Sequence, residues 1–402
     1  MSWSEIALGD AIHVKHGFAF KGQHFSDSGE FIVLTPGNFY EEGGFRVRPG
    51  KDRFYTGDIP EGYVLEEDDL IVAMTEQGPG LLGSSALIPE GGKYLHNQRL
   101  GLIQERNGLI DKKFLYYLFN TKAVRGQISG SATGTKVRHT APERIYRVRV
   151  TVPADLNEQK KIASILSAYD DLIENNQRRI QLLEQAARLL YREWFVHLRF
   201  PGHEHVRVVD GVPEGWGRKR LSELCTDVRD ATDPKTLPPE TVYIGLEHIP
   251  RRSITLNDWG SAADVDSTKY KFAEGDILFG KIRPYFHKVG FALVDGITSS
   301  DAIVIRPNGN QLYHYVLFLL SSAEFVALAS KTVREGSKMP RADWKFLLKS
   351  EFLLPPHTLL TLFSDTVAPI CDQLRNLALM NQQLTQARDL LLPRLMNGEV
   401  AV

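Results

Sequence analysis

The chain repeats its own sequence, and no other feature restricts its fold as strongly. Four short motifs of the first half recur in the same order in the second half. The matching pairs are Trp3 and Leu8 with Trp216 and Leu221, residues 65–75 (LEEDDLIVAMT) with residues 272–282 (FAEGDILFGKI), residues 134–137 (GTKV) with residues 336–339 (GSKM), and Val152-Pro153 with Leu354-Pro355. A repeat of about half the chain predicts two copies of one architecture.

The two halves also share a layout. In each half, about 150 residues with short strands, Gly-rich turns and one or two helical stretches precede a helical pattern of roughly 40 residues. We therefore predict an α+β fold with an internal pseudo-twofold repeat. Its expected parts are a mixed α/β domain at 1–153, a long helix at 154–200, a second mixed domain at 201–355 and a second long helix at 356–402. We expect the stretch 199–217, which includes His203 and His205, to be a solvated linker rather than a metal site.

The two long helices carry a narrow apolar stripe. The first is expected to start after Pro153, with Asp155 or Asn157 as its cap. Apolar residues then follow at steps of three and four, with one slip between Leu172 and Ile180, which is typical of a coiled-coil seam. The predicted seam residues are Ile162, Ile165, Tyr169, Leu172, Ile180, Leu183, Ala187, Leu190 and Trp194 in the first helix, and Phe363, Val367, Ile370, Leu374, Leu377, Leu384, Leu391 and Leu395 in the second.

Such a stripe needs a partner helix. The nearest partner is the other helix of the same chain, in an antiparallel coiled coil that separates the two mixed domains. A homodimeric coiled coil is the alternative. Asn176 and Asn381 fall within the predicted seams, where a polar side chain fixes register at a cost in stability. Alternatively, both side chains lie at the seam edge and are solvated.

Positive charge is concentrated locally, because the chain as a whole carries a net charge of −1. Residues 121–150 contain seven Lys and Arg against one acidic residue, and residues 331–351 contain six against three. The two clusters occupy equivalent places in the repeat, which favours a nucleic-acid-binding face over an ordinary solvated surface. A further cluster of Lys281, Arg283, His287 and Lys288 has no strong counterpart in the first half.

The basic clusters contain the candidate DNA-binding residues. Residues 147–152 alternate between basic and apolar and predict a half-buried strand, and the flexible loop before it carries both cations and hydroxyl groups. Asn, Gln and Arg side chains suit base edges, although Asn97 and Ser299 are expected to cap turns. The predicted DNA-binding residues are Lys136, Arg138, His139, Arg144, Gln98, Arg99, Lys281, Arg283, Lys338, Arg341 and Lys345.

Catalytic and targeting motifs are absent from the sequence. It contains no phosphate-binding G-x4-G-K-[ST] loop, no [ND]-P-P-aromatic tetrapeptide, no G-x-S-x-G and no H-E-x-x-H. We therefore expect no catalytic residues and no bound metal. The two cysteines, Cys225 and Cys371, are expected to be reduced thiols of a cytoplasmic protein. No signal peptide and no membrane-spanning run of about 18 apolar residues is expected.

Several strings resemble one known family, the specificity subunits of type I restriction–modification enzymes. The duplicated layout and residues 157–195 (NEQKKIASILSAYDDLIENNQRRIQLLEQAARLLYREWF) resemble that family, as does the ending DLLLPRLMNGEV at 389–400. The segments GFAFKG at 17–22 and GTKVRHT at 134–140 resemble parts of its target recognition domains. The resemblance covers essentially the whole chain.

The resemblance implies a non-catalytic DNA-recognition subunit. Each mixed domain would be a target recognition domain that reads one part of a bipartite site in double-stranded DNA. The paired helices would dock two S-adenosylmethionine-dependent adenine methyltransferase subunits, which motor-nuclease subunits join. The chain itself would bind no cofactor. The second helix departs from the pattern, with HTLLTLFSD at 357–365 in place of the charged opening. The alternatives are a specificity subunit of a methylation-only or other-type restriction system, a coiled-coil scaffold without DNA affinity, or a stand-alone enzyme.

Overall fold

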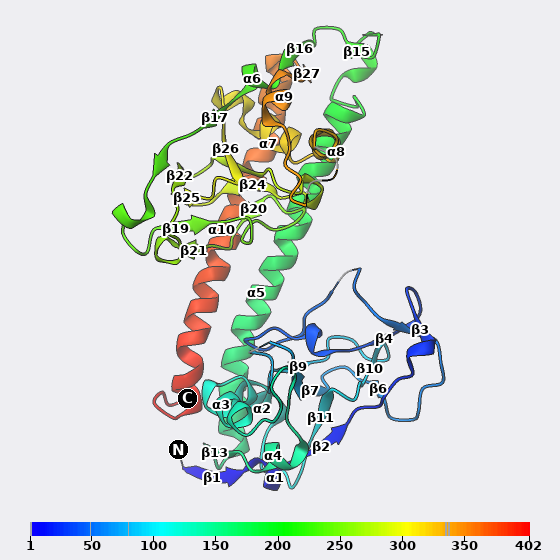
Figure 1. The fold of residues 1–402 in the computed structure, drawn as a ribbon, viewed down its shortest axis with the longest axis vertical. Coiled ribbons are helices and arrows are strands. Elements are labelled where there is room, and N and C mark those ends of the chain that lie inside the picture. The colour runs from blue at the N-terminus through cyan, green and yellow to red at the C-terminus, as the bar shows by residue number, and fades with distance from the viewer. Residues whose placement is uncertain (1, 49, 79, 334–335, 337) are drawn as a thin grey trace. The chain divides into compact units, whose positions relative to one another are not determined.

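The structure, a computed structural model, describes residues 2–48, 50–78, 80–333, 336 and 338–402. The chain divides into two compact units. Unit 1 comprises Met1–Asp171 and Thr385–Val402, and unit 2 comprises Leu172–Leu384. Both units contain strands and helices, so the predicted α+β class is confirmed (Figure 1).

Unit 1 contains a four-stranded sheet in the order β2-β11-β7-β9 and a five-stranded sheet in the order β3-β5-β4-β10-β6. The strands of the first are Ile12–His16, Leu100–Glu105, Leu70–Ala73 and Ser85–Leu87, and those of the second are Phe25–Ser26, Phe54–Tyr55, Phe31–Val33, Tyr94–Leu95 and Val64–Leu65. The short helices are α1 (Leu8–Ala11), α2 (Lys112–Phe119), α3 (Lys122–Gly130) and α4 (Pro142–Tyr146). The side chains of Asp111 and Thr121 cap α2 and α3 by accepting an N–H from the first turn. Leu70, Val72 and Phe114 bring the four-stranded sheet and α2 into one buried core.

Unit 2 contains two five-stranded sheets, in the orders β17-β26-β23-β24-β20 and β18-β22-β25-β19-β21. The strands of the first are Cys225–Val228, Ala302–Pro307, Ile277–Gly280, Val289–Ala292 and Thr255–Leu256, and those of the second are Ala231–Thr232, Lys269–Phe272, Gly296–Thr298, Val242–Ile244 and Gly260–Ser261. The short helices are α6 (Leu221–Leu224), α7 (Tyr313–Leu320), α8 (Ala323–Lys331) and α9 (Trp344–Lys349). Among the described residues, no single helix is long and apolar enough to cross a membrane, and one bent pair, Asn310–Leu320 with Ala323–Lys331, meets that test only when both are taken together.

The sequence repeat corresponds to repeated hydrogen bonds. The Glu66 N–H donates to Asp69 Oδ2 at 2.9 Å, and the matching Ala273 N–H donates to Asp276 Oδ2 at 2.8 Å. An antiparallel strand pair closes each copy, and in each a leucine follows the first strand. The pairs are β1 (Trp3–Ala7) with β13 (Arg149–Pro153), and β16 (Gly217–Arg220) with β27 (Glu351–Leu354). Each unit therefore builds the same turn and the same closing strands from its own copy of the motifs.

Two long helices each contribute to both units. Helix α5 spans Leu156–Tyr191 and continues as a π-helical turn at Arg192–Val196, while α10 spans His357–Met396. The Oδ1 atom of Asp155 accepts the Asn157 N–H at 2.9 Å, so Asp155 caps α5.

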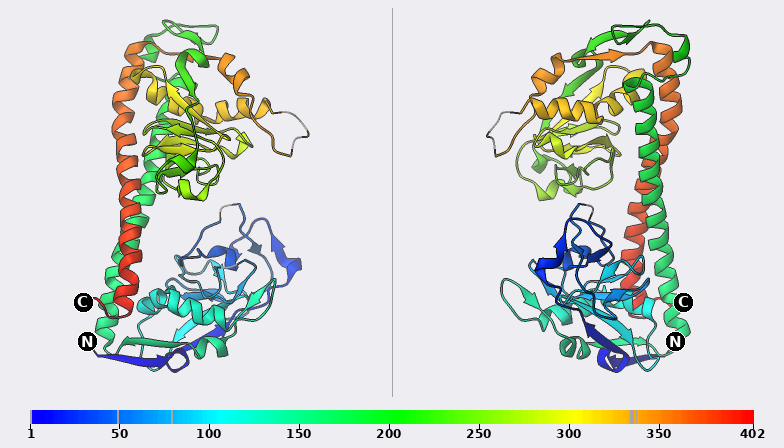
Figure 2. Two further views of the ribbon diagram at one scale, coloured as in Figure 1. Left: turned by 60° about the vertical axis from the view of Figure 1, so that its left-hand side comes forward. Right: turned by 90° about the vertical axis from the view of Figure 1, so that its right-hand side faces the viewer.

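Within unit 2 the two long helices pack antiparallel (Figure 2). Asn176 on α5 lies against Asn381 on α10, and further along α5 the ring of Tyr191 lies 6.2 Å from that of Phe363. The Asn176 amide donates to Asn381 Oδ1 at 2.9 Å, and the Asn381 amide donates to the Ile173 carbonyl at 3.1 Å. Both asparagines are buried, so they lie in the seam rather than at its solvated edge.

Within unit 1 a polar contact also joins the two helices. Arg388 on α10 donates to Asp170 on α5 at 2.6 Å, and Tyr117 on α2 donates its hydroxyl to the same carboxylate at 2.6 Å. Burial, together with the pairing with Asp170, raises the pKa of Tyr117. Ile162 and Leu395 from the two helices share the unit 1 core.

The predicted seam of the first helix was wrong at two positions. Ile165 is 36% exposed and Leu172 is 53% exposed, whereas Leu166 is fully buried. The predicted slip after Leu172 does not occur, because Ile173 and Asn176 continue the stripe at the normal spacing. A seam predicted from apolar residues alone omits the buried Asn176, and it then includes Leu172 instead of the neighbouring Ile173.

Candidate nucleic-acid interface

The end of β7 in unit 1 lies between two of the predicted DNA-binding segments. On one side, the Met74 N–H donates to the Arg99 carbonyl at 3.0 Å. On the other, the Thr140 N–H donates to the Met74 carbonyl at 2.9 Å, and Thr75 pairs with His139 in a two-stranded ladder. We call this set of backbone contacts the strand-end frame of unit 1.

Unit 2 builds the same frame at the end of β23. The Lys281 N–H donates to the Asp301 carbonyl at 3.0 Å, and the Ala342 N–H donates to the Lys281 carbonyl at 2.9 Å. Ile282 forms an antiparallel bridge with Arg341. The strand-end frame of unit 2 therefore puts Asp301 where unit 1 has Arg99, and Arg341 where unit 1 has His139.

The turns before Arg99 and Asp301 are capped as the sequence predicts. Asn97 Oδ1 accepts the Arg99 N–H at 3.0 Å, and Ser299 Oγ accepts the Asp301 N–H at 3.1 Å. Asn97 and Ser299 thus stabilise their turns. The Gln98 side chain is exposed beside Arg99, and its backbone N–H donates to the Phe18 carbonyl at 3.0 Å.

A buried carboxylate anchors the unit 1 loop. Glu76 is 4% exposed, and its Oε2 accepts the N–H groups of Leu81 at 3.0 Å and Leu82 at 2.9 Å. Its Oε1 accepts from Arg138 at 3.1 Å, and Arg138 also donates to the Ser129 carbonyl. The Arg138 guanidinium, predicted to contact DNA, therefore has partners within unit 1.

Two more arginines of the first basic cluster have partners within unit 1. Arg144, also predicted to contact DNA, donates to Thr133 Oγ1 at 2.9 Å and to the His139 carbonyl at 3.3 Å. Arg125 donates to the carbonyls of Leu82 and Glu41 at 3.0 and 2.9 Å. Lys136 and His139, by contrast, are exposed on the loop that these arginines hold.

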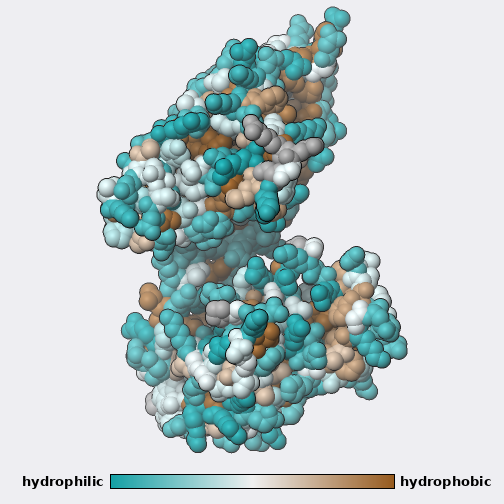
Figure 3. Space-filling model, in the orientation of Figure 1, coloured by the Kyte–Doolittle hydropathy of each residue, from teal (hydrophilic) through white to brown (hydrophobic). Residues whose placement is uncertain are grey.

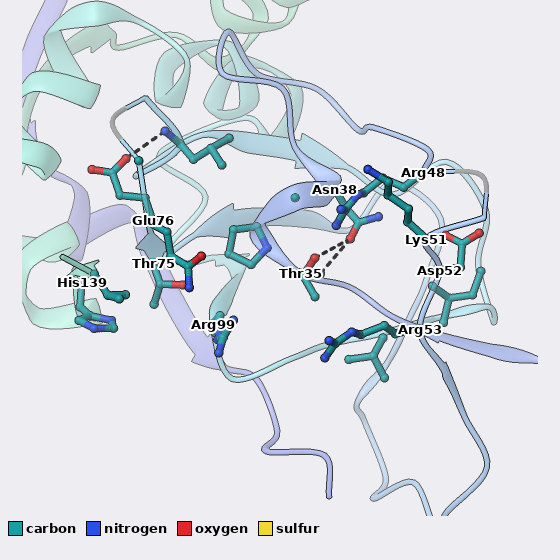
Figure 4. Close-up of a pocket in the computed structure, with 18 residues that line it drawn as sticks. Thr35, Asn38, Arg48, Lys51, Asp52, Arg53, Thr75, Glu76, Arg99 and His139 are labelled. Atoms are coloured by element: carbon teal, nitrogen blue, oxygen red, sulfur yellow. Dashed lines mark hydrogen bonds between the residues drawn. The ribbon is translucent and has the colours of Figure 1, made fainter. Parts of the chain in front are cut away.

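A cavity of about 600 Å³ lies beside the strand-end frame of unit 1. Figure 4 shows Arg48, Lys51, Asp52 and Arg53 on one side of it and Thr75, Glu76 and His139 on the other, with Arg99 between them. Thr35 and Asn38 also line it, and Asn38 Oδ1 accepts both the N–H and the hydroxyl of Thr35. Because Glu76 is paired with Arg138, the remaining charged groups of the lining are mainly cationic.

Three of these cations, Arg48, Lys51 and Arg53, were not predicted from the sequence. Residues 46–53 contain four Lys and Arg against one Asp, so a charge count over short windows detects them. Arg48 lies over the backbone of Gly37, where an added Cβ would lie 2.4 Å from its Nη1 atom. A larger residue at position 37 would therefore displace the Arg48 guanidinium from its place in the cavity lining.

The remaining predicted residues lie on or near the unit 2 frame. Arg341 is exposed and donates to Asp301 Oδ1 at 3.2 Å, and Arg283 donates to the Lys338 carbonyl at 3.4 Å. Lys281 is half-buried and donates to the Ser300 carbonyl. Lys338 and Lys345 are exposed. Arg334, Glu335 and Ser337, which belong to the second basic cluster, lie outside the described residues.

The predicted basic strand begins two residues later than expected. Strand β13 starts at Arg149, whereas Arg147 is the C-cap residue of α4. Within the strand Val150 and Val152 are buried and Arg149 is exposed, as the alternation predicts. The short helix that starts at Pro142 accounts for the difference, because its C-cap is Arg147 and the chain becomes extended only after that turn.

Comparison with protein families matches the first part of the chain. Residues 1–185 match the family described as the type I restriction modification DNA specificity domain. The MjaIX specificity subunit of a type I restriction enzyme from Methanocaldococcus jannaschii is 25% identical over 327 residues, 76% of this chain and 73% of that protein. The EcoBI specificity subunit from Escherichia coli is 25% identical over 276 residues, 64% of this chain and 53%, about half, of that protein.

A solved structure shares the fold. The crystal structure of the type I restriction–modification S subunit from M. genitalium aligns with 98% of this chain and 96% of its own, with a TM-score of 0.62 and 14% sequence identity. The likeness at that identity establishes the shared fold.

Proposed function

Because this chain belongs to the specificity subunits of type I restriction–modification enzymes, we propose that it reads a bipartite site in double-stranded DNA. Residues 1–153 and 201–355 are two target recognition domains, and each reads one half of the site. The observation that supports this division is the repeated strand-end frame, which holds a basic loop beside a capped turn in both units.

The DNA-contacting groups proposed for unit 1 are those that project from the frame or line its cavity. Gln98, Arg99, Lys136 and His139 belong to the frame and its loops, and Arg48, Lys51 and Arg53 belong to the cavity. Arginine can donate two hydrogen bonds to guanine, and lysine contacts phosphate without sequence preference. Arg138 and Arg144 act as positioning residues, because their guanidinium groups hold the loop from within.

In unit 2 the proposed contacts are Arg341, Lys338, Lys345 and Arg283, with Lys281 as a positioning residue. The long helices at 154–200 and 356–402 form an antiparallel coiled coil that sets the spacing of the two half-sites. They dock two adenine methyltransferase subunits, and motor-nuclease subunits complete the assembly in the cytoplasm.

The proposal is tested by expressing the chain with its methyltransferase partner and mapping N6-methyladenine across the host genome. One two-part motif with a fixed spacer is expected. Replacing residues 1–153 with those of a relative should change one half of the motif and leave the other half and the spacer unchanged. A swap that alters both halves contradicts independent reading. A chain that assembles with the methyltransferase but directs no methylation contradicts the proposal as a whole.

A further inference from the structure

One turn of unit 2 is held in an unusual backbone conformation. Arg283 and His287 flank the short helix η7 (Pro284–Phe286), and both have positive φ, 48° and 56°. Arg252, with φ 59°, donates its N–H to the His287 carbonyl at 2.9 Å. Three non-glycine residues in the left-handed region thus meet at one turn. Such residues persist only where the surrounding structure holds them, and they cluster at functional sites.

Buried contacts fix the turn from beneath. The ring of His287 is buried, and its Nε2 donates to the Ser321 carbonyl at 2.8 Å. Burial lowers the pKa of His287, so the ring is held as a neutral donor. The Arg283 N–H donates to the Pro340 carbonyl at 2.8 Å, and Pro284 is buried. These contacts hold the turn against the basic loop and against the segment between α7 and α8.

The turn presents an exposed aromatic ring among cations. Tyr285 is 53% exposed, and its ring centre lies 5.0 Å from that of Phe286. The Arg251 guanidinium lies 3.9 Å from the centre of the Phe286 ring, and that of Arg283 lies 5.8 Å from it. Figure 3 shows mostly hydrophilic residues on the visible face of each unit. What sets Tyr285 apart is the combination of an exposed aromatic ring, a backbone held in the left-handed region and two neighbouring arginines.

We propose that Tyr285 is a DNA-contacting residue of unit 2, whose ring inserts at a partly unstacked base step of the unit 2 half-site and stacks there while Arg251 and Arg283 bind the adjacent phosphates. DNA-binding proteins insert apolar side chains between the base steps of a duplex and partly unstack them, and arginines bind the neighbouring phosphates. A ring already fixed in place loses little conformational freedom on binding. The proposal rests on the proposed function, because it presumes that unit 2 reads DNA.

The contact is specific to unit 2. In the repeat, Arg283 corresponds to Glu76, and the residues that follow Glu76 are Gln77-Gly78-Pro79-Gly80, without an aromatic side chain. The sequence of the first half thus has no equivalent of Tyr285. We expect its loss to affect one half-site only.

The test measures binding of the chain, assembled with its methyltransferase subunits, to duplexes that carry the mapped site. Tyr285→Ala should weaken binding about 5- to 150-fold, the range observed when a base-stacking aromatic ring is removed. Tyr285→Phe, which keeps the ring, should bind within about twofold of the wild type. Val209→Ala, which truncates another side chain of unit 2 that is 53% exposed, is the matched control and should bind unchanged. With 2-aminopurine placed along the unit 2 half-site, the wild type should alter fluorescence at one position and Tyr285→Ala should not.

Three outcomes overturn the inference. Wild-type affinity in Tyr285→Ala excludes a DNA contact of the ring. Equal losses in Tyr285→Ala and Tyr285→Phe exclude stacking. Impaired assembly with the methyltransferase, with normal DNA affinity of the complexes that do form, assigns the surface to a protein partner. Each of these leaves the two-part recognition by the wild type intact, whereas a wild-type complex that selects no two-part site refutes the proposed function itself.

Discussion

On the strand-end frame, unit 1 carries Arg99 and His139 at the two positions where unit 2 carries Asp301 and Arg341. The backbone contacts at these positions match to within 0.1 Å in their hydrogen-bond lengths, at 3.0 and 2.9 Å in both units. The side chains differ in charge and in pairing. Asp301 accepts from Arg341 at 3.2 Å, whereas no ion pair involves Arg99 among the described residues.

The comparison separates what builds the interface from what it recognises. Main-chain hydrogen bonds and the Asn97 and Ser299 caps fix the position of both loops, so the exposed side chains are free to differ without altering the frame. The side chains that anchor the loops also differ. Unit 1 uses the buried Glu76, and unit 2 has Arg283 at the equivalent position. Two units of one fold can therefore read different chemistry.

The largest expected effect comes from removing the buried anchor of unit 1. Glu76→Ala leaves two backbone N–H groups and Arg138 without their acceptor, which should destabilise unit 1 by about 4 kcal/mol. Asp301→Ala in unit 2 removes only a half-buried partner of the exposed Arg341, and should cost less than about 1 kcal/mol. Hydrogen–deuterium exchange of residues 75–82 and 133–140, together with thermal unfolding, measures both. Equal costs in the two variants would show that the anchors do not distinguish the units.

The next effect is a difference in acid sensitivity. His96 is buried in unit 1, where the equivalent residue in unit 2 is the buried Thr298. Burial lowers the pKa of His96 to about 4, and its Nε2 donates to the Leu100 carbonyl at 3.0 Å. Below about pH 6.5 the unfolded chain binds a proton at His96, whereas the folded chain binds this proton only below about pH 4. The stability of unit 1 therefore falls by about 3 kcal/mol as the pH drops from about 6.5 to about 4, and it levels off at lower pH.

His96→Gln, which is neutral at every pH and keeps a donor, should remove this loss from unit 1. Hydrogen–deuterium exchange of unit 1 peptides between pH 7 and pH 4 measures this loss of stability in the wild type and the variant. Unit 2 peptides serve as the internal control. His287 and His314 in unit 2 also have pKa values lowered by burial, so unit 2 should show its own pH dependence, equal in the wild type and the variant. An unchanged pH dependence of unit 1 in the variant would rule out His96 as its source.

The fold could be predicted largely because the repeat is carried by residues with local roles. Asp69 and Asp276 each accept an N–H three residues back in their own turns, so the sequence alone reveals them. The seam of the first long helix was predicted less well. Ile165 and Leu172 each stand next to another apolar residue, and a spacing of three or four residues does not say which of two neighbours is buried.

The interface could be predicted only in outline. Charge counts located both basic loops but did not separate cations that reach solvent from cations used inside the unit. Arg138 and Lys136 look alike in the sequence, yet Arg138 pairs with a carboxylate 62 residues away and Lys136 is exposed. The Arg53 side of the cavity was not predicted, because a short basic run such as residues 46–53 does not show by itself whether its side chains line a cavity or face solvent. Long-range pairing of this kind leaves no local pattern.

The smallest expected effect tests the charge difference between the two frames directly. Arg99→Gln in unit 1 removes an exposed cation without an ion pair, so the salt dependence of DNA binding should weaken by about one phosphate contact. Arg341→Gln in unit 2 removes a cation that Asp301 already neutralises in part, so the salt dependence of DNA binding should weaken by less than in Arg99→Gln.

Asp301→Asn completes the comparison, because it frees Arg341 from its carboxylate and makes unit 2 resemble unit 1 in charge. If Arg341 contacts phosphate, this variant should bind a few-fold more tightly and with a steeper salt dependence, by about one phosphate contact. Binding isotherms at several salt concentrations, with duplexes carrying the mapped site, measure both quantities. A carboxylate can also accept a hydrogen bond from cytosine. Asp301→Asn would then bind less tightly and lose preference at one base pair, which would place Asp301 itself, rather than Arg341, in contact with the bases.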